Sequence, residues 1–250
     1  MYRMNKIKII SLLLLLAAAL MAVQPDVGVP AESDLQLKKE GFALGYSFQY
    51  RQAVWVAYLL KKENLLSKQV RRRENFRPDP DVKLHPVYPK DYRRSGYDKG
   101  HLAPAADMTY SFASMNNSFL MTNISPQIPG CNRGIWKRLE NQVRSWAIRE
   151  RKLYVITGPV FSDKILLMRN TSIPVPDAFY KVILDLTPPM KMIGFIVPNK
   201  ASKRRVATFA VPVDEVERIT GYDFFSELDD KTEKRLEKKC NFSAWKNAVR

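Results

Sequence analysis

Hydrophobic and polar positions alternate at the start of the first strongly patterned part of the chain. From residue 42 to residue 50, every second side chain is apolar or aromatic, which is the period of a strand with one buried face. A largely apolar stretch, residues 53–60, follows after a short polar break. The pattern predicts a hairpin of two strands.

Three further runs have the composition of buried strands. They cover residues 153–160, 178–186 and 190–197, and the last two are joined across Pro188 and Pro189. Together with the hairpin, they predict a sheet whose members are separated by segments of other character.

Helical spacing marks three segments. The first has an apolar stripe formed by Ile135, Leu139, Val143, Trp146 and Ala147. That spacing predicts a helix over about 132–149, with Asn132 as its N-cap. Residues 213–220 are predicted to form a second helix, and the charge-rich residues 229–239 a third that is interpreted as a solvated face.

Residues 67–94 are polar and rich in proline, and they include three consecutive arginines at 71–73. Repeated prolines exclude a regular helix over most of this segment. We expect a long ordered loop over one face of the domain, a kind of segment that is often functional. The arginines alone are also compatible with a solvated edge.

The N-terminus predicts targeting. Residues 1–23 combine basic residues with an apolar run of about 15 residues, as in an export signal or, if uncleaved, an N-terminal anchor. Residues 24–40 are interpreted as a tether, and residues 41–250 as a single domain. The expected location is periplasmic or extracellular, with membrane anchoring only if the N-terminal segment is retained.

The net charge says more about the binding partner than the length or the overall composition does. The 250 residues carry a formal net charge of +16, which indicates a polyanionic partner such as nucleic acid or an anionic membrane. A basic surface that serves only solubility is the alternative. Two cysteines, Cys131 and Cys240, allow either one disulfide or two free thiols, and without a CxxC pair they exclude a cysteine-rich zinc site.

Histidine is scarce, since the chain has only His85 and His101. Imidazole chemistry near neutral pH must use one of them. His101 follows Gly100, which permits a close backbone approach or a positive φ, whereas His85 lies in the proline-rich loop. A hydrogen-bonded structural role is the alternative for His101.

The predicted helix at 132–149 adds candidate ligands. Asn132, Glu140 and Arg144 are separated by multiples of four residues and share roughly one side of a helix. An asparagine oxygen can bind Mg²⁺, a glutamate can orient water around the ion, and an arginine can contact phosphate or pair with the glutamate. An exposed, salt-bridged helix face is the alternative.

Several ordered motifs resemble the DNA/RNA non-specific endonucleases, a ββα-metal family that includes endonuclease G. The resemblance rests on residues 98–104, Asp-Lys-Gly-His-Leu-Ala-Pro, and on residues 123–127, Asn-Ile-Ser-Pro-Gln. It extends to Asn132 with Trp136, Leu139 and Glu140, to Gly-Tyr-Ser at 45–47, to Trp-Val-Ala-Tyr at 55–58, and to Asn-Phe-Arg at 75–77. The family implies an α+β fold, with a central, mainly antiparallel sheet flanked by helices and a ββα-metal catalytic motif.

The resemblance also implies residue roles. His101 matches the general base, Asn132 the direct ligand of Mg²⁺ (Mn²⁺ being the other candidate ion), and Glu140 the residue that holds water around the metal. Asn123 matches a polar residue beside the site. Arg144 matches a basic residue of the catalytic helix and is a candidate for both catalysis and substrate binding. Arg73 matches, more loosely, an upstream arginine that contacts phosphate.

Lys99 departs from the family signature, which has arginine there. Lysine keeps the charge but lacks the planar fork that grips phosphate through two bonds. Lys99 is therefore both a candidate catalytic and substrate-binding residue and the main difference from the family.

The resemblance predicts a Mg²⁺-dependent, non-specific endonuclease that hydrolyses DNA and RNA to 5′-phosphate products, and the N-terminal pattern predicts that it is exported. Its partner is the DNA or RNA backbone, and a homodimer is one of the oligomeric states that the sequence allows. The alternatives are a catalytically weak or silent nucleic-acid-binding protein on the same scaffold, and a protein that binds anionic membranes.

Overall fold

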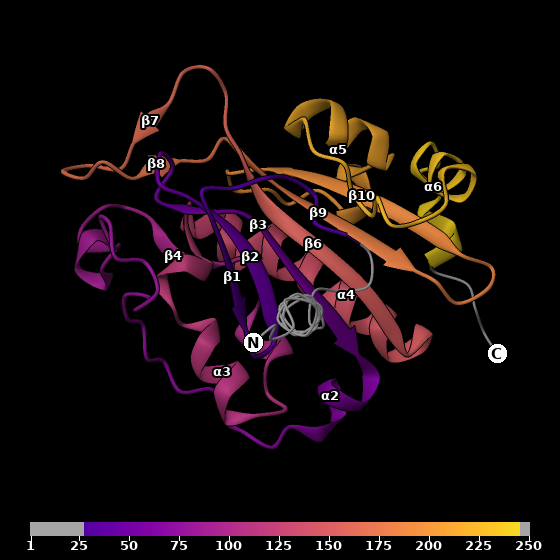
Figure 1. Cartoon of the computed structure of the whole chain (residues 1–250), viewed down its shortest axis with the longest axis horizontal. Helices are drawn as coiled ribbons and strands as arrows, with labels where there is room; N and C mark the ends of the chain where they lie inside the picture. The colour runs from indigo at the N-terminus through magenta and orange to yellow at the C-terminus, as the bar shows by residue number, and fades with distance from the viewer. Residues whose placement is uncertain (1–27, 246–250) are drawn as a thin grey trace, which may run out of the picture.

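A seven-stranded sheet forms the centre of the molecule. The computed structural model describes residues 28–245, so the predicted signal at 1–23 lies outside the described residues. The strand order is β1-β2-β3-β6-β9-β10-β11, and every neighbouring pair in it is antiparallel (Figure 1). The strands are β1 (Leu35–Lys39), β2 (Phe42–Ser47), β3 (Gln52–Lys61), β6 (Lys152–Val160), β9 (Ala178–Asp185), β10 (Lys191–Pro198) and β11 (Ala210–Val211).

Two small ribbons lie beside this sheet. The first pairs β4 (Asp98–His101) with β5 (Ile124–Gln127), and the second pairs β7 (Leu166–Leu167) with β8 (Pro174–Val175). The helices are α2 (Lys62–Ser67), α3 (Phe112–Ser118), α4 (Lys137–Glu150), α5 (Val213–Thr220) and α6 (Asp230–Glu237). No helix among residues 28–245 has the length and apolar character needed to span a bilayer.

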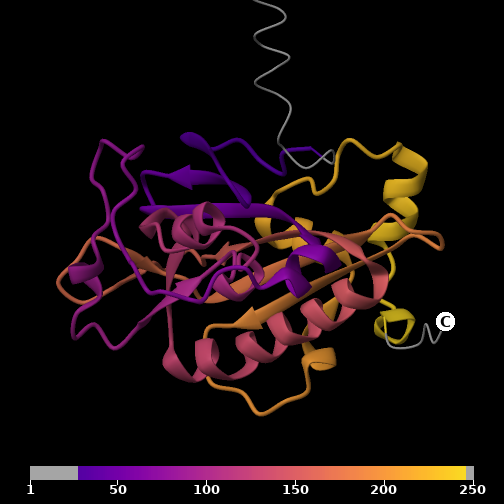
Figure 2. The ribbon, with the colours of Figure 1, turned by 90° about the horizontal axis from the view of Figure 1, so that it is seen from below.

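Helices cover both faces of the sheet, which gives three layers. Apolar residues of α4, Leu139, Val143 and Trp146 among them, join one core cluster with one face of the strands. Val213 and Val216 of α5 and Leu236 of α6 join a second cluster on the opposite face. Figure 2 shows α4 lying along one side of the sheet, with α6 beyond the other. This arrangement confirms the predicted α+β fold with an antiparallel central sheet.

The predicted hairpin and the three other strands are confirmed within two residues at each end, except that the first strand ends at Ser47. The helix at 213–220 is confirmed, and the charge-rich helix is shorter, from Asp230 to Glu237. The predicted boundary of the tether is corrected: residues 35–39 form β1, which pairs with β2 at the edge of the sheet. Leu37 of this strand is buried, so its apolar contact outweighs its polar neighbours.

The prediction of Asn132 as a helix N-cap is wrong. A π-helical segment, Cys131–Trp136, precedes α4, and Gly130 is its N-cap. Gly134 has a non-helical backbone (φ −107°, ψ −107°), which marks a kink between this segment and α4. Such π-type insertions re-aim side chains and are frequent at functional sites.

The two cysteines are free thiols, Cys131 buried and Cys240 exposed. Of the alternatives that the sequence left open, the structure therefore has no disulfide between them.

Candidate functional site

A cavity of about 440 Å³ lies between the β4–β5 ribbon, the loop around residues 72–76 and the helical segment that begins at Cys131. It is polar, and its basic lining residues outnumber its acidic ones. Its charged and polar lining residues are Arg72, Glu74, Asp98, Lys99, His101, Asn132, Arg133, Lys137, Glu140 and Arg144. The structure thus brings together His101, Lys99, Asn132, Glu140 and Arg144, the residues proposed from the sequence, in one place.

His101 stands at the end of β4 with its ring against two phenylalanines that also contact each other. The ring centroids of Phe76 and Phe119 lie 5.5 and 5.1 Å from that of the imidazole. Within residues 28–245, the buried Nε2 of His101 has no hydrogen-bond partner. Burial, with a smaller repulsion from Arg72, lowers the pKa of His101 to about 3. The imidazole is therefore neutral at pH 7, with a ring nitrogen not committed to any protein group.

The backbone around His101 is held in place by β5 and by Asn123. Gly100 pairs with Ser125 across the ribbon, and a Cβ on Gly100 would lie 2.3 Å from the side chain of Gln127. Asn123 is fully buried; its Oδ1 accepts a hydrogen bond from Ala103 N at 2.8 Å, and its Nδ2 donates to Ala103 O. Asn123 therefore orients the chain two residues beyond His101 and does not line the cavity itself.

Asn132 is oriented by Asp98. Its Nδ2 donates a hydrogen bond of 2.9 Å to Asp98 Oδ2, and Arg133 donates to both oxygens of the same carboxylate. Partial burial alone would raise the pKa of Asp98, but the hydrogen bonds from Arg133 and Asn132 outweigh it and lower the pKa. With Nδ2 directed to Asp98, the Oδ1 of Asn132 accepts no hydrogen bond from residues 28–245, which leaves a hard oxygen ligand available.

Behind the cavity lies a group of four buried or half-buried charges. Arg144 donates a 2.7 Å ion-paired hydrogen bond to Asp107, so the predicted alternative of an Arg144–Glu140 pair is not what forms. Burial raises the pKa of Glu140, opposed by the positive charges of Lys181 and Arg144. Lys181 is fully buried, with its Nζ 4.8 Å from the ring centroid of Trp136 and without a hydrogen-bond partner in the described chain. Glu140 therefore lies near the positive charges of Lys181 and Arg144 but forms a salt bridge with neither within residues 28–245.

Two cations flank His101. Lys99 lines the cavity and holds its Nζ 4.8 Å from the centroid of Phe76. Arg72 also lines it, paired with Glu74 at 2.9 Å. Arg73, the upstream arginine proposed from the sequence, is not brought together with the others, because it faces a separate cavity beside α3.

Sequence reasoning missed Asp98, Arg72, Asp107 and Lys181 as residues that shape this site. Asp98 was visible as the first residue of the signature, and Lys181 as a charge inside a buried strand. Arg72 differs from Arg73 only in the direction of its side chain, which the sequence did not reveal.

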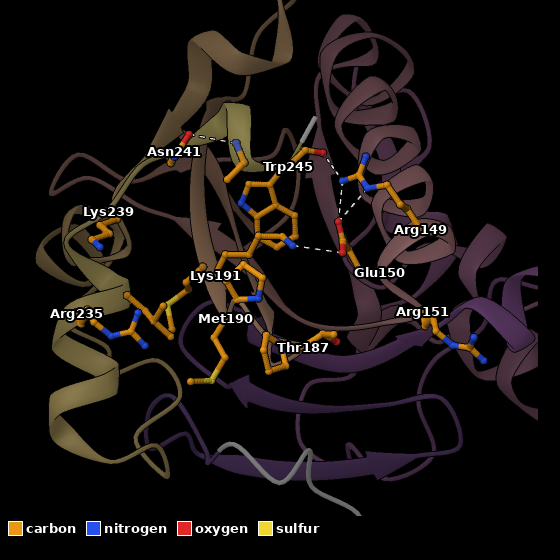
Figure 3. Close-up of a pocket in the computed structure, with 15 residues that line it drawn as sticks. Arg149, Glu150, Arg151, Thr187, Met190, Lys191, Arg235, Lys239, Asn241 and Trp245 are labelled. Carbon is orange, nitrogen blue, oxygen red and sulfur yellow. Dashed lines mark hydrogen bonds and ion pairs between the residues drawn. The ribbon is translucent and has the colours of Figure 1, made fainter. Parts of the chain in front are cut away.

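A larger cavity of about 600 Å³ lies at the other end of α4 (Figure 3). Its walls include Met190, Trp245 and the paired charges of Arg149, Glu150 and Lys191. It contains neither a histidine nor a carboxylate free of an ion pair. The chemistry indicated by the sequence therefore belongs to the smaller cavity.

Comparison with known proteins points to the same group of enzymes. The family model described as DNA/RNA non-specific endonuclease matches residues 24–231. The chain is 32% identical over 216 residues to a nuclease of Nostoc sp., covering 81% of this chain and 77% of that protein. It is 35% identical to nuclease C1 of Cunninghamella echinulata var. echinulata (82% and 88% covered) and 31% identical to the mitochondrial endonuclease G of Homo sapiens (79% and 71%).

A solved structure of an EndoG/EndoGI complex contains a chain with a similar fold. The TM-score is 0.77 at 28% sequence identity, and the alignment covers 84% of this chain and 96% of the other.

Proposed function

Because the chain belongs to the family of DNA/RNA non-specific endonucleases, we propose that it hydrolyses phosphodiester bonds in the cavity lined by His101, Asn132 and Glu140. The observation that carries this proposal is the convergence, in one basic cavity, of a neutral histidine and an asparagine with an unpaired Oδ1. The two groups supply a proton acceptor and a metal ligand, which are the parts that water attack on phosphorus requires.

His101 acts as the general base. Its depressed pKa keeps it unprotonated, so the imidazole accepts a proton from the attacking water, at the ring nitrogen that faces the cavity, as that water approaches phosphorus in line. Phe76 and Phe119 restrict the ring and exclude bulk water from one side of it.

Asn132 and Glu140 fit a divalent metal. Asn132 would hold Mg²⁺ or Mn²⁺ through Oδ1, and Glu140 would orient water around the ion. The chemistry that such an ion supplies is stabilisation of negative charge on the phosphate and on the leaving 3′ oxygen. Departure of the 3′ oxygen gives 5′-phosphate products.

The cations of the cavity bind the nucleic-acid backbone. Arg144 is fixed by Asp107 and by Asn141, whose Oδ1 accepts at 2.6 Å, and Lys99 and Arg72 line the same cavity. Arg73 faces outward from this group and would contact only a longer substrate. Contacts to phosphates carry no base information, which suits a non-specific enzyme.

We also propose that the enzyme is exported and acts in the periplasm or outside the cell, as a single nuclease domain. This part of the proposal rests on the basic and apolar pattern of residues 1–23.

The test is incubation of the purified protein with plasmid DNA and with RNA, with chelator and after addition of Mg²⁺ or Mn²⁺. Both substrates should be cut only with metal, and the fragments should accept 5′ label from a kinase only after phosphatase treatment. Intact substrates under all metal conditions, or fragments that take label directly, would contradict the proposal.

A further inference from the structure

Five carboxylates gather on the face of the sheet opposite α4, in a protein whose net charge is +16. Asp214 and Glu217 belong to α5, Glu233 and Glu237 belong to α6, and Asp223 lies on the segment between the helices. Figure 1 shows α5 and α6 next to each other over β10. The family match ends at residue 231, so Glu233 and Glu237 lie beyond it.

The five side chains form two overlapping triads that share Glu237. Asp214, Glu217 and Glu237 make up one triad, and Asp223, Glu233 and Glu237 make up the other; in each, the ligand oxygens lie within 4.8 Å of one another. Two oxygens bound to the same Ca²⁺ at about 2.4 Å are at most about 4.8 Å apart. The spacing therefore allows the oxygens of each triad to bind a common cation.

Glu237 shares a side-chain hydrogen bond with Glu217 but has no basic partner within residues 28–245. It is 6% exposed, and its Oε1 has no hydrogen-bond partner within residues 28–245. The Oε1 of Glu233 is likewise buried and unpartnered there. None of the five carboxylates forms an ion pair with a lysine or arginine of the described chain.

Such an arrangement is costly without a counter-charge. A buried carboxylate with no partner loses its hydration, and neighbouring carboxylates repel it. Burial and the charges of Glu217 and Glu233 accordingly raise the pKa of Glu237 to about 8. Two states remove the repulsion: a proton held on Glu237, or a cation shared by the cluster.

We propose that the cluster centred on Glu237 binds a divalent cation of the calcium class, which ties α6 to α5. Five carboxylates supply only hard oxygen ligands, which favours Ca²⁺ over a transition metal that takes nitrogen or sulfur. Flexible ligands from three segments suit the 6–8 oxygens that Ca²⁺ accepts better than the strict octahedron that Mg²⁺ requires. The ion is structural and separate from the nuclease site, and the inference does not rest on nuclease activity.

The test is thermal unfolding of the full chain in chelator, Ca²⁺ or Mg²⁺. It is run on the wild type and on Asn132→Ala, which removes the proposed metal ligand of the nuclease site. Ca²⁺ at 100 times its Kd should raise Tm by about 5 °C or more in both proteins. In Asn132→Ala, Mg²⁺ at the same concentration should raise Tm less than Ca²⁺ does.

Glu237→Gln distinguishes a cluster that binds a cation from one that only holds a proton on Glu237. In chelator at pH 9, above the pKa of Glu237, this variant should melt above the wild type, because the glutamine removes a buried like charge. In Ca²⁺ at the same pH that order should reverse, because the variant should no longer respond to the ion. Asp214→Asn should reduce the response by weakening one triad. Glu215→Gln is the matched control: Glu215 is on α5 but pairs with Arg218, and its variant should keep the full Ca²⁺ shift.

Three results would overturn the proposal. One is the absence of any Ca²⁺-dependent shift in Asn132→Ala up to millimolar concentrations. Another is a shift that persists in Glu237→Gln, and the third is a shift that Asn132→Ala alone abolishes, which would place the ion in the nuclease cavity. Since melting is read without substrate, none of these results depends on whether the protein cuts nucleic acid.

Discussion

At the scale of single residues, the direction of the Asn132 amide is the feature on which the proposed metal site depends. Asp98 lies 2.9 Å from Nδ2, so an aspartate at position 132 would direct a carboxylate oxygen at another carboxylate. Asn132→Asp should therefore lose at least about tenfold in kcat even though aspartate is ordinarily a good Mg²⁺ ligand, and Asn132→Ala should lose about 100-fold or more.

The exchange Asp98→Asn combined with Asn132→Asp tests this orientation. The pair keeps one amide and one carboxylate in contact and should recover part of the activity, a coupling that a double-mutant cycle measures. Activity that simply falls by the product of the two single effects would show that Asp98 does not orient Asn132.

Lys99 is the residue at which this chain departs from the family signature. Its ammonium lies over Phe76 beside His101, where a guanidinium could grip phosphate through two bonds. Lys99→Arg should raise kcat/KM on plasmid DNA by about two- to tenfold, and Lys99→Ala should lower it by at least about tenfold. Equal activity in all three proteins would show that this position does not contact the substrate.

The sequence could predict the site residues that are marked by their spacing or by their chemical type, but not the partners that fix them. His101, Asn132, Glu140 and Arg144 were found from scarcity, helical spacing and resemblance, and all four line one cavity. Partners such as Asp107 for Arg144 are 37 positions away in sequence, and such long-range pairs depend on how elements pack rather than on local pattern. Periodicity equally cannot tell which of two adjacent arginines, Arg72 or Arg73, faces inward.

At the scale of elements, the β4–β5 ribbon requires a glycine at position 100, because the side chain of Gln127 lies where a Cβ would be. A methyl group on Gly100 would meet the Gln127 side chain at 2.3 Å. Gly100→Ala should therefore lower the free energy of unfolding by about 1–3 kcal/mol, as measured by urea denaturation.

Gln127→Ala provides the control for Gly100→Ala, because it removes the atoms that the new methyl group would meet. The double variant should be destabilised by less than the sum of the two single effects. Strict additivity would show that the contact with Gln127 is not the cause.

Strands and helices with a clear period were predicted, and elements set by tertiary contact were not. β1 was interpreted as part of a tether because the segment that contains it has two prolines and several acidic and polar residues. Pairing with β2 nevertheless satisfies its backbone and buries Leu37. The π-helical segment before α4 has no periodic signal of its own, and its kink at Gly134 could not be read from residue spacing.

At the scale of the whole molecule, charge is distributed unevenly. The proposed nuclease cavity is lined by five basic residues, Arg72, Lys99, Arg133, Lys137 and Arg144. Five carboxylates gather instead on α5, α6 and the segment between them, on the opposite face of the sheet. A basic cavity attracts the phosphate backbone, and the attraction is lost as counterions compete for it.

Binding should accordingly weaken steeply with salt. With four or so phosphates neutralised, the affinity of the inactive His101→Asn variant for duplex DNA should fall about 100-fold between 50 and 200 mM salt. Fluorescence anisotropy with a labelled duplex measures this, and a fall of less than about threefold would contradict binding through phosphates.

The central claim is that His101 is the base of a nuclease site, and the chain's two histidines provide a matched test. His85 is exposed, lies outside the cavity and has a positive φ of 50°, which asparagine tolerates. The decisive measurement is the rate of plasmid cleavage with Mg²⁺ by His101→Asn and His85→Asn, each shown to be folded by circular dichroism. We expect His101→Asn to lose about 10²–10⁴-fold in rate and His85→Asn to stay within about twofold of the wild type. Cleavage by His101→Asn at the wild-type rate would contradict the assignment.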